Sequence, residues 1–187
     1  MNYFEYHPRN KEIVMRAKEV YSGYFDFSMS DESIEARFYL YEYLRTSMRA
    51  FSPLEKDVNG VPIPIILENN ECLYWSISHT EKYVAFIISD TQTGIDIAEL
   101  RDRDPSLLDI HSEDEYNLLG EKDWKQFYML WTAKESIIKA SSLTLDVISE
   151  IRLVGVCEGD EFLFVFEEKE FRIHTVTQDT FILSYIF

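Results

Sequence analysis

Cysteine, glycine and long apolar runs are all scarce in this chain. Its 187 residues include two cysteines, six glycines and five prolines. Two distant cysteines, Cys72 and Cys157, with no CxxC pair predict neither a disulfide framework nor a cysteine metal site. No apolar run approaches the roughly 20 residues that cross a membrane, and the N-terminal stretch MNYFEYHPRNKE is too polar for a signal peptide. A cytoplasmic protein with no membrane partner is therefore expected.

Basic residues are the other deficit. Lysine and arginine number 18 against 34 acidic residues, which gives a formal net charge of -16. Nucleic acids and anionic membrane surfaces are bound through basic faces, so neither is expected as a partner. The chain is 46% hydrophobic and 15% aromatic, enough at this length for a sizeable packed core rather than disorder.

Helical and strand patterns occur in two blocks. The first predicts a strand at 1–7, helices at 11–21 and 32–51, and strands at 72–78 and 83–89. The second predicts a strand at 93–98, a helix capped by Ser112, a long helix through 140, and strands at 151–156, 162–166, 171–176 and 181–187. This is an α+β pattern. No Pro-, Gly- or Ser-rich linker divides the blocks, so we expect halves 1–92 and 93–187 in one compact unit.

The sequence WTAKESIIKA, residues 131–140, continues the long helix. Its apolar stripe includes Phe127, Trp131 and Ile138, and we expect Lys134, Glu135 and Lys139 at the margins of this stripe. Glu135 and Lys139 are four residues apart and project from one face. Taken alone, such a pair indicates a surface ion pair worth a few tenths of a kcal/mol.

The strand TGIDIA, residues 93–98, gives the pair a possible partner. Ile95 and Ile97 face one side and Asp96 the other, in a strand expected to be central. A carboxylate there is costly unless a cation or hydrogen-bond donor meets it. We therefore expect Asp96 and Glu135 to converge on a cation, with Lys139 one turn further along the helix.

GIDIA followed about forty residues later by WTAKESIIKA resembles the two-part signature of the 4′-phosphopantetheinyl transferases. That signature is a hydrophobic-Gly-hydrophobic-Asp run, then Trp/Phe-small-x-Lys-Glu-Ser/Ala, two further residues and Lys. Every fixed position of the second part is present. The architecture resembles that of the single-chain, surfactin-synthetase-activating type. The resemblance implies a pseudo-duplicated α+β fold of two similar halves, each with helices packed on an antiparallel sheet.

The resemblance also implies an activity. The family transfers the 4′-phosphopantetheine arm of coenzyme A, the co-substrate, to a serine hydroxyl of an apo acyl or peptidyl carrier protein. By this resemblance, Asp96 and Glu135 hold Mg²⁺, a cation that prefers hard oxygen ligands. Glu135 is also the candidate base, and Lys139 contacts the phosphates beside the reaction. Glu135 and Lys139 are thus the implied catalytic residues.

Three positions in the first half resemble coenzyme A contacts of the family. Ser78 and His79 match a Ser-His element that contacts the 3′-phosphate end. Arg37 occupies the place of an arginine that helps to hold the nucleotide phosphates, a task that suits a bidentate guanidinium. The implied coenzyme A contacts are therefore Arg37, Ser78, His79 and Lys139. By composition alone, a histidine after a strand is more often structural.

The chain departs from the family pattern at several positions. Ala98 replaces a second acid on the Asp96 strand, Val61 replaces a lysine, and residues 24–35 carry no lysine or arginine. These losses leave open a catalytically weakened, transferase-like protein that acts as a binding or regulatory partner. A purely structural ion-pair network is a third hypothesis. The retained Asp96 and Glu135 favour the hypothesis of an active enzyme. A protein that had lost catalysis would have little physical need for two carboxylates directed at one point.

Overall fold

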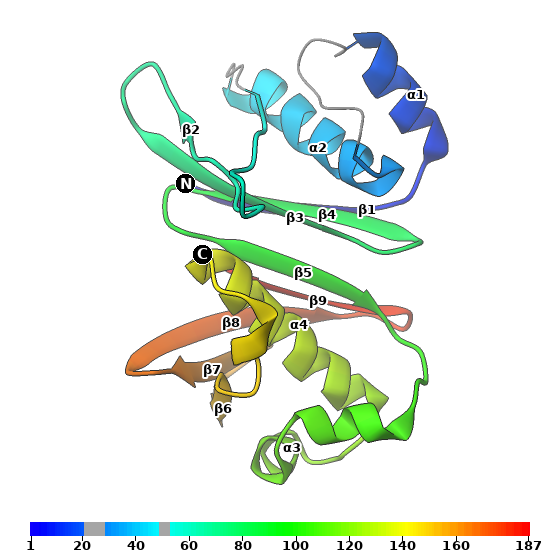
Figure 1. Ribbon diagram of the computed structural model, residues 1–187, viewed down its shortest axis with the longest axis vertical. Coiled ribbons are helices and arrows are strands. Elements are labelled where there is room, and N and C mark those ends of the chain that lie inside the picture. Colours follow the sequence, from blue (N-terminus) through cyan, green and yellow to red (C-terminus); the bar gives the residue numbers. More distant parts are fainter. Residues whose placement is uncertain (21–28, 49–52) are drawn as a thin grey trace. The chain divides into compact units, whose positions relative to one another are not determined.

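The structure is a computed structural model (Figure 1), and it describes residues 1–20, 29–48 and 53–187. Two compact units make up the chain. The first is Met1–Thr93 with Phe187, and the second is Gly94–Ile186. Each unit has its own sheet, helices and buried core. The expectation that the halves form one compact body stays a prediction.

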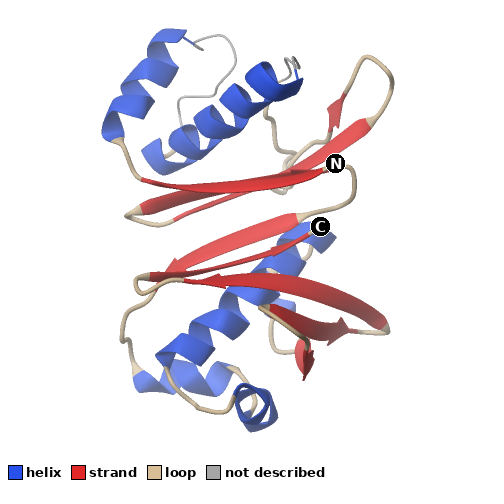
Figure 2. Ribbon diagram, turned by 180° about the vertical axis from the view of Figure 1, so that it is seen from behind, coloured by secondary structure: helices blue, strands red, loops and turns tan. Residues whose placement is uncertain are grey.

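The first unit packs two helices on one face of a four-stranded antiparallel sheet (Figures 1 and 2). Its helices are α1 (Lys11–Val20) and α2 (Asp31–Tyr43), and a π-helical turn (Leu44–Met48) follows α2. Its strands are β1 (Asn2–Pro8), β2 (Ile65–Ile66), β3 (Cys72–His79) and β4 (Tyr83–Ser89), in the order β1-β4-β3-β2.

Helix α2 supplies much of the first core. Its N-cap is Ser30, whose hydroxyl accepts a hydrogen bond from the Ser33 N–H at 3.3 Å. Buried apolar side chains recur along it at the helical period, at Ile34, Phe38, Tyr41 and, in the following turn, Leu44, and Ala36 and Leu40 are buried as well. The predicted helix break at Ser22–Gly23 and the predicted helix end at Phe51 lie outside the described residues.

The second unit packs the long helix α4 (Trp124–Ser141) against one face of a five-stranded antiparallel sheet (Figure 2). Two 3-10 turns (Pro105–Ile110 and Leu145–Val147) and helix α3 (Glu113–Leu119) flank α4. The strands are β5 (Gly94–Glu99), β6 (Arg152–Val156), β7 (Glu161–Phe166), β8 (Lys169–Thr177) and β9 (Phe181–Ile186).

The two sheets share one topology. In each unit the first strand pairs antiparallel with the last, β1 with β4 and β5 with β9, and the remaining strands follow in reverse chain order. The second unit carries one strand more. The predicted α+β fold of two similar halves is therefore confirmed. The expectation of a central Asp96 strand is wrong, because β5 ends the order β5-β9-β8-β7-β6.

The ends of α3 and α4 follow local capping rules. The predicted capping box is present: the Ser112 hydroxyl accepts from the Glu115 N–H at 3.4 Å, and a Glu115 carboxylate oxygen accepts from the Ser112 N–H at 3.0 Å. Gly120 ends α3 in the left-handed region, at φ 97°. Asp123 caps the start of α4. Among the helices in the described ranges, none combines the length and hydropathy of a membrane span.

A buried ion pair fastens α4 to α3. Lys134 is fully buried, and its Nζ lies 2.8 Å from Glu115 Oε1. The same oxygen accepts a hydrogen bond from the Leu153 N–H on β6 at 3.0 Å. Burial opposes ionisation of Glu115, but Lys134 and the backbone N–H groups of Leu153 and Ser112 together outweigh burial and lower the Glu115 pKa. The expectation that Lys134 lies at the margin is wrong, because α3 and β6 cover that side of α4.

Candidate functional site

The carboxylate of Asp96 and the ammonium of Lys139 form an ion pair between β5 and α4. Lys139 Nζ donates to Asp96 Oδ1 at 2.7 Å and to the Ile95 carbonyl oxygen at 3.0 Å. Asp96 is buried, whereas the Lys139 side chain is 29% exposed. A charge-assisted hydrogen bond in such a half-buried setting holds the lysine against the strand more firmly than a surface pair would.

Gly94 permits this close approach of helix and strand. A Cβ at this position would lie 2.0 Å from the Ser136 carbonyl oxygen and 2.8 Å from the Ala140 backbone nitrogen. The φ angle of Gly94 is outside the left-handed region, so the glycine is needed for its lack of a side chain. The glycine of GIDIA thereby brings the strand of Asp96 directly against the helix of Glu135.

Glu135 completes the cluster of charges. Its side chain is partly buried, and burial raises the pKa of Glu135, with a further rise from the negative charge of Asp96 and a partial offset by Lys139. A nearby like charge disfavours ionisation, so Asp96 acts on the Glu135 pKa in the same direction as burial. The structure pairs Asp96 with Lys139, and Glu135 lies one turn before Lys139 on α4. The convergence of Asp96 and Glu135 on one cation stays a prediction.

The carboxylates of Asp96 and Glu135 fit a divalent cation whose other coordination positions are taken by water or substrate. Mg²⁺ is commonly bound by one or two carboxylates together with water and substrate phosphates. Across residues 1–20, 29–48 and 53–187, no group of three or more His, Cys, Asp or Glu side chains could enclose a metal ion. Ala98, two residues after Asp96 on the same side of β5, adds no ligand. Asp96 and Glu135 would be the protein's ligands, and water or phosphate would supply the others.

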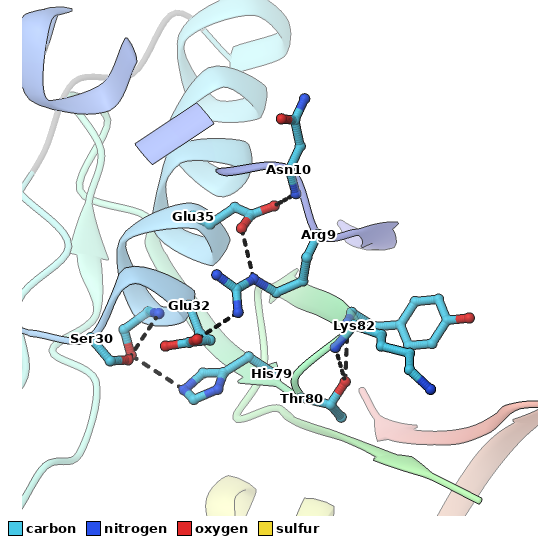
Figure 3. Close-up of polar contacts among 10 residues, drawn as sticks. Arg9, Asn10, Ser30, Glu32, Glu35, His79, Thr80 and Lys82 are labelled. Carbon is cyan, nitrogen blue, oxygen red and sulfur yellow. Dashed lines mark hydrogen bonds and ion pairs between the residues drawn. The ribbon is translucent and has the colours of Figure 1, made fainter. Parts of the chain in front are cut away.

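The residues predicted to contact the nucleotide end lie in the first unit. Ser78 and His79 end β3, where Ser78 is buried and His79 is exposed. His79 Nε2 lies 3.4 Å from the Ser33 hydroxyl near the start of α2, beside the cluster drawn in Figure 3. An exposed imidazole at a strand end can meet a phosphate without moving the backbone.

Arg37 is held inside the first unit. It is 5% exposed, and its guanidinium donates to the Leu54 and Ser33 carbonyl oxygens, both at 3.3 Å. It also lies over the Trp75 ring, 5.6 Å from the centroid. These contacts give Arg37 a packing role within the unit, and its contact with coenzyme A stays a prediction.

An unforeseen ion-pair cluster lies beside His79 (Figure 3). Arg9 Nε donates to Glu35 Oε2 at 2.9 Å, and Arg9 Nη1 donates to Glu32 Oε1 at 2.5 Å. Glu35, fully buried, also accepts the Asn10 N–H at 2.6 Å. The cluster ties the turn before α1 to α2. Its partners are more than 20 residues apart in sequence, so no local pattern signals it.

The charge balance of this cluster is negative. One guanidinium faces two carboxylates, and the pKa of Glu32 is lowered by a hydrogen bond from its own backbone N–H and by Arg9. Arg9 therefore does not replace the basic cluster that the sequence lacks. The surroundings of His79 offer an anion less positive charge than the family resemblance implies.

Comparison with known proteins assigns the second unit to a family. A family model described as the 4′-phosphopantetheinyl transferase superfamily matches residues 92–185, slightly more than half of the chain. The chain belongs to this superfamily. The match contains Asp96, Glu135 and Lys139. No curated protein matches the chain in a sequence comparison.

Membership in the 4′-phosphopantetheinyl transferase superfamily settles the general chemistry. Its members transfer the phosphopantetheine arm of coenzyme A to carrier proteins, typically with a divalent metal. The chain is therefore a transferase of this superfamily.

Proposed function

We propose that the protein is a Mg²⁺-dependent holo-carrier-protein synthase of the surfactin-synthetase-activating type. It moves the phosphopantetheine arm of coenzyme A to a serine of an apo acyl or peptidyl carrier protein, at the cytoplasmic location that the sequence predicts. The observation that carries the proposal is the cluster of Asp96, Glu135 and Lys139, two mutually repelling carboxylates and one ammonium. That arrangement suits a cation bound to phosphate better than it suits a structural ion pair.

The proposed roles follow from position and charge. Asp96 and Glu135 hold the metal, which when bound neutralises phosphate oxygens. Glu135 accepts the proton of the serine hydroxyl, directly or through one water. The raised pKa of Glu135 supports this role, because a base is most effective when its pKa approaches the working pH.

The transfer needs no reactant other than the carrier serine and coenzyme A. The serine oxygen forms a bond to the phosphorus that carries the pantetheine arm, and the pyrophosphate bond to the nucleotide breaks. The nucleotide leaves with the electron pair of that bond. We assign to Lys139, whose side chain is 29% exposed, the contact with the phosphate oxygens as negative charge shifts toward the leaving group.

His79→Ala is expected to raise the coenzyme A concentration needed for half-maximal rate by about tenfold, with little change in kcat. The reason is the loss of one hydrogen bond to a charged phosphate, worth about 1.5–3 kcal/mol. Steady-state rates over a range of coenzyme A concentrations measure it. His174→Ala, at a partly exposed histidine of β8, is the control. An unchanged KM for coenzyme A in His79→Ala would remove His79 from the nucleotide end.

The alternative is a weakened, transferase-like binding partner. The neutral Ala98 and the two carboxylates around Arg9 favour it, since both reduce the capacity for metal or phosphate. Intact-mass analysis of several apo carrier proteins, incubated with this protein, coenzyme A and Mg²⁺, separates the two. The proposal predicts a mass gain of one phosphopantetheine arm on at least one carrier. No gain, together with no coenzyme A binding by calorimetry, would support the alternative.

A further inference from the structure

Three buried hydroxyls form a line between α4 and the sheet of the second unit. The Thr132 and Ser184 hydroxyl oxygens are 2.8 Å apart, and those of Ser184 and Thr175 are 2.9 Å apart. The Thr132 hydroxyl also donates to the Tyr128 carbonyl oxygen at 2.8 Å. Thr132, Ser184 and Thr175 are each at most 2% exposed. The line is therefore shielded from solvent and links helix to sheet directly.

The direction of each hydrogen bond follows from counting protons. A hydroxyl has one proton to donate. Because Thr132 donates to the Tyr128 carbonyl, Ser184 must donate to Thr132, and Thr175 must in turn donate to Ser184. With Thr132 present the line has one arrangement, and removal of the Thr132 oxygen would leave one buried hydroxyl proton of the line without its acceptor.

The line ends beside the charged cluster. Ser184 pairs directly with Asp96 in the β5–β9 register, so the two side chains lie on the same face of the sheet. Thr132 precedes Glu135 by three residues and Lys139 by seven, spacings that place all three along one side of α4. The hydroxyl bond thus fixes α4 to the sheet on one side of Glu135, and the Lys139–Asp96 pair fixes it on the other.

We infer that Thr132 and Ser184 are positioning residues that set the separation of Glu135 from Asp96. Apolar packing alone is not directional and permits small shifts of a helix on a sheet. A buried hydrogen bond of 2.8 Å permits much less. Metal ligands must be held within about 0.5 Å of their working geometry. The inference rests on the proposed function, because it assigns these hydroxyls to the same metal site.

Thr132→Val tests the inference, since valine keeps the shape and removes the hydroxyl. Binding of Mn²⁺, followed by electron paramagnetic resonance without coenzyme A or carrier, is expected to weaken about tenfold, as for lost outer-shell partners of metal sites. Ser184→Ala should weaken it similarly, and Thr132→Ser should restore it. The transfer rate of Thr132→Val should recover at high Mg²⁺. Ser136→Ala is the matched control, because its hydroxyl donates to the Ala133 carbonyl of the same helix and to no other group among the described residues.

Each result of these measurements either supports or overturns the inference. Weaker Mn²⁺ binding in Thr132→Val and Ser184→Ala, with Ser136→Ala unchanged, supports the inference. A lower Tm in Thr132→Val with unchanged Mn²⁺ affinity would overturn it and leave the hydroxyls a purely structural role. An equal loss in Ser136→Ala would overturn it as well. A wild-type protein that binds no Mn²⁺ and transfers nothing would instead overturn the proposed function, and this inference with it.

Discussion

Glu135→Gln is expected to abolish transfer while the fold stays intact. Glutamine has nearly the same shape but can neither take the serine proton nor supply a charged ligand beside Asp96. Loss of a positioned base alone costs about 10²–10⁴ in rate, so the rate should fall at least about a hundredfold. The mass of an apo carrier over time measures it. Glu150→Gln, at an exposed carboxylate, should keep the full rate.

The stability of Glu135→Gln should not fall with its activity. The folded-state pKa of Glu135 is raised above its ordinary value of 4.5, chiefly by burial and then by Asp96. The wild-type protein therefore loses stability as the pH rises from that value through the raised pKa. Glutamine removes this loss, so the variant should be at least as stable at pH 7 and should show no advantage well below the ordinary pKa.

Urea unfolding of both proteins at several pH values measures this difference. Lower stability of the variant at neutral pH would attribute the lost activity to damaged structure. Full transfer by a stable variant would contradict the metal and base roles together.

Gly94→Ala is expected to lower the free energy of unfolding of the second unit by more than about 3 kcal/mol, the upper end of the usual cost of overpacking. The added Cβ would meet the Ser136 carbonyl oxygen at 2.0 Å and the Ala140 nitrogen at 2.8 Å. Both are backbone atoms of a long helix, so no side-chain rotation can relieve the clash. Relief of the clash requires α4 to move away from β5, which would also separate Glu135 from Asp96.

Chemical denaturation followed by tryptophan fluorescence measures the effect of Gly94→Ala. The control is Gly155→Ala on β6, where a Cβ would lie 3.8 Å from the nearest atom, Leu163 Cβ, at ordinary contact distance. That variant should stay within about 0.5 kcal/mol of the wild type. A Gly94→Ala protein of wild-type stability would contradict the close packing of β5 on α4.

Local patterns in the sequence predict the part of the site that the second unit holds. Alternation along β5 places Asp96 on the opposite face of the strand from Ile95 and Ile97. The helical period places Glu135 and Lys139 on one face of α4. The two-part motif adds that strand and helix meet. The capping box at Ser112 is likewise predicted, because its two hydrogen bonds depend on residues three apart.

Contacts between distant residues are the part that the sequence does not predict. Lys134 has the same spacing as a solvated helix residue, and only its pairing with Glu115 on α3 accounts for its burial. The ion pairs of Arg9 and the hydroxyl line of Thr132 and Ser184 likewise join segments far apart in the chain. The edge position of β5 follows from its pairing with the last strand, which alternation within β5 does not encode.

The most direct test of the central claim is the metal dependence of transfer to one apo carrier protein. Separate samples of the apo carrier are incubated with coenzyme A and this protein, one with Mg²⁺, one with EDTA, and one with EDTA followed by excess Mg²⁺, and the intact mass of each is followed. The proposed site of Asp96, Glu135 and Lys139 predicts a gain of one phosphopantetheine arm with Mg²⁺, no gain when EDTA is present from the start, and a gain once excess Mg²⁺ is restored. A gain that EDTA leaves unchanged would contradict the metal site.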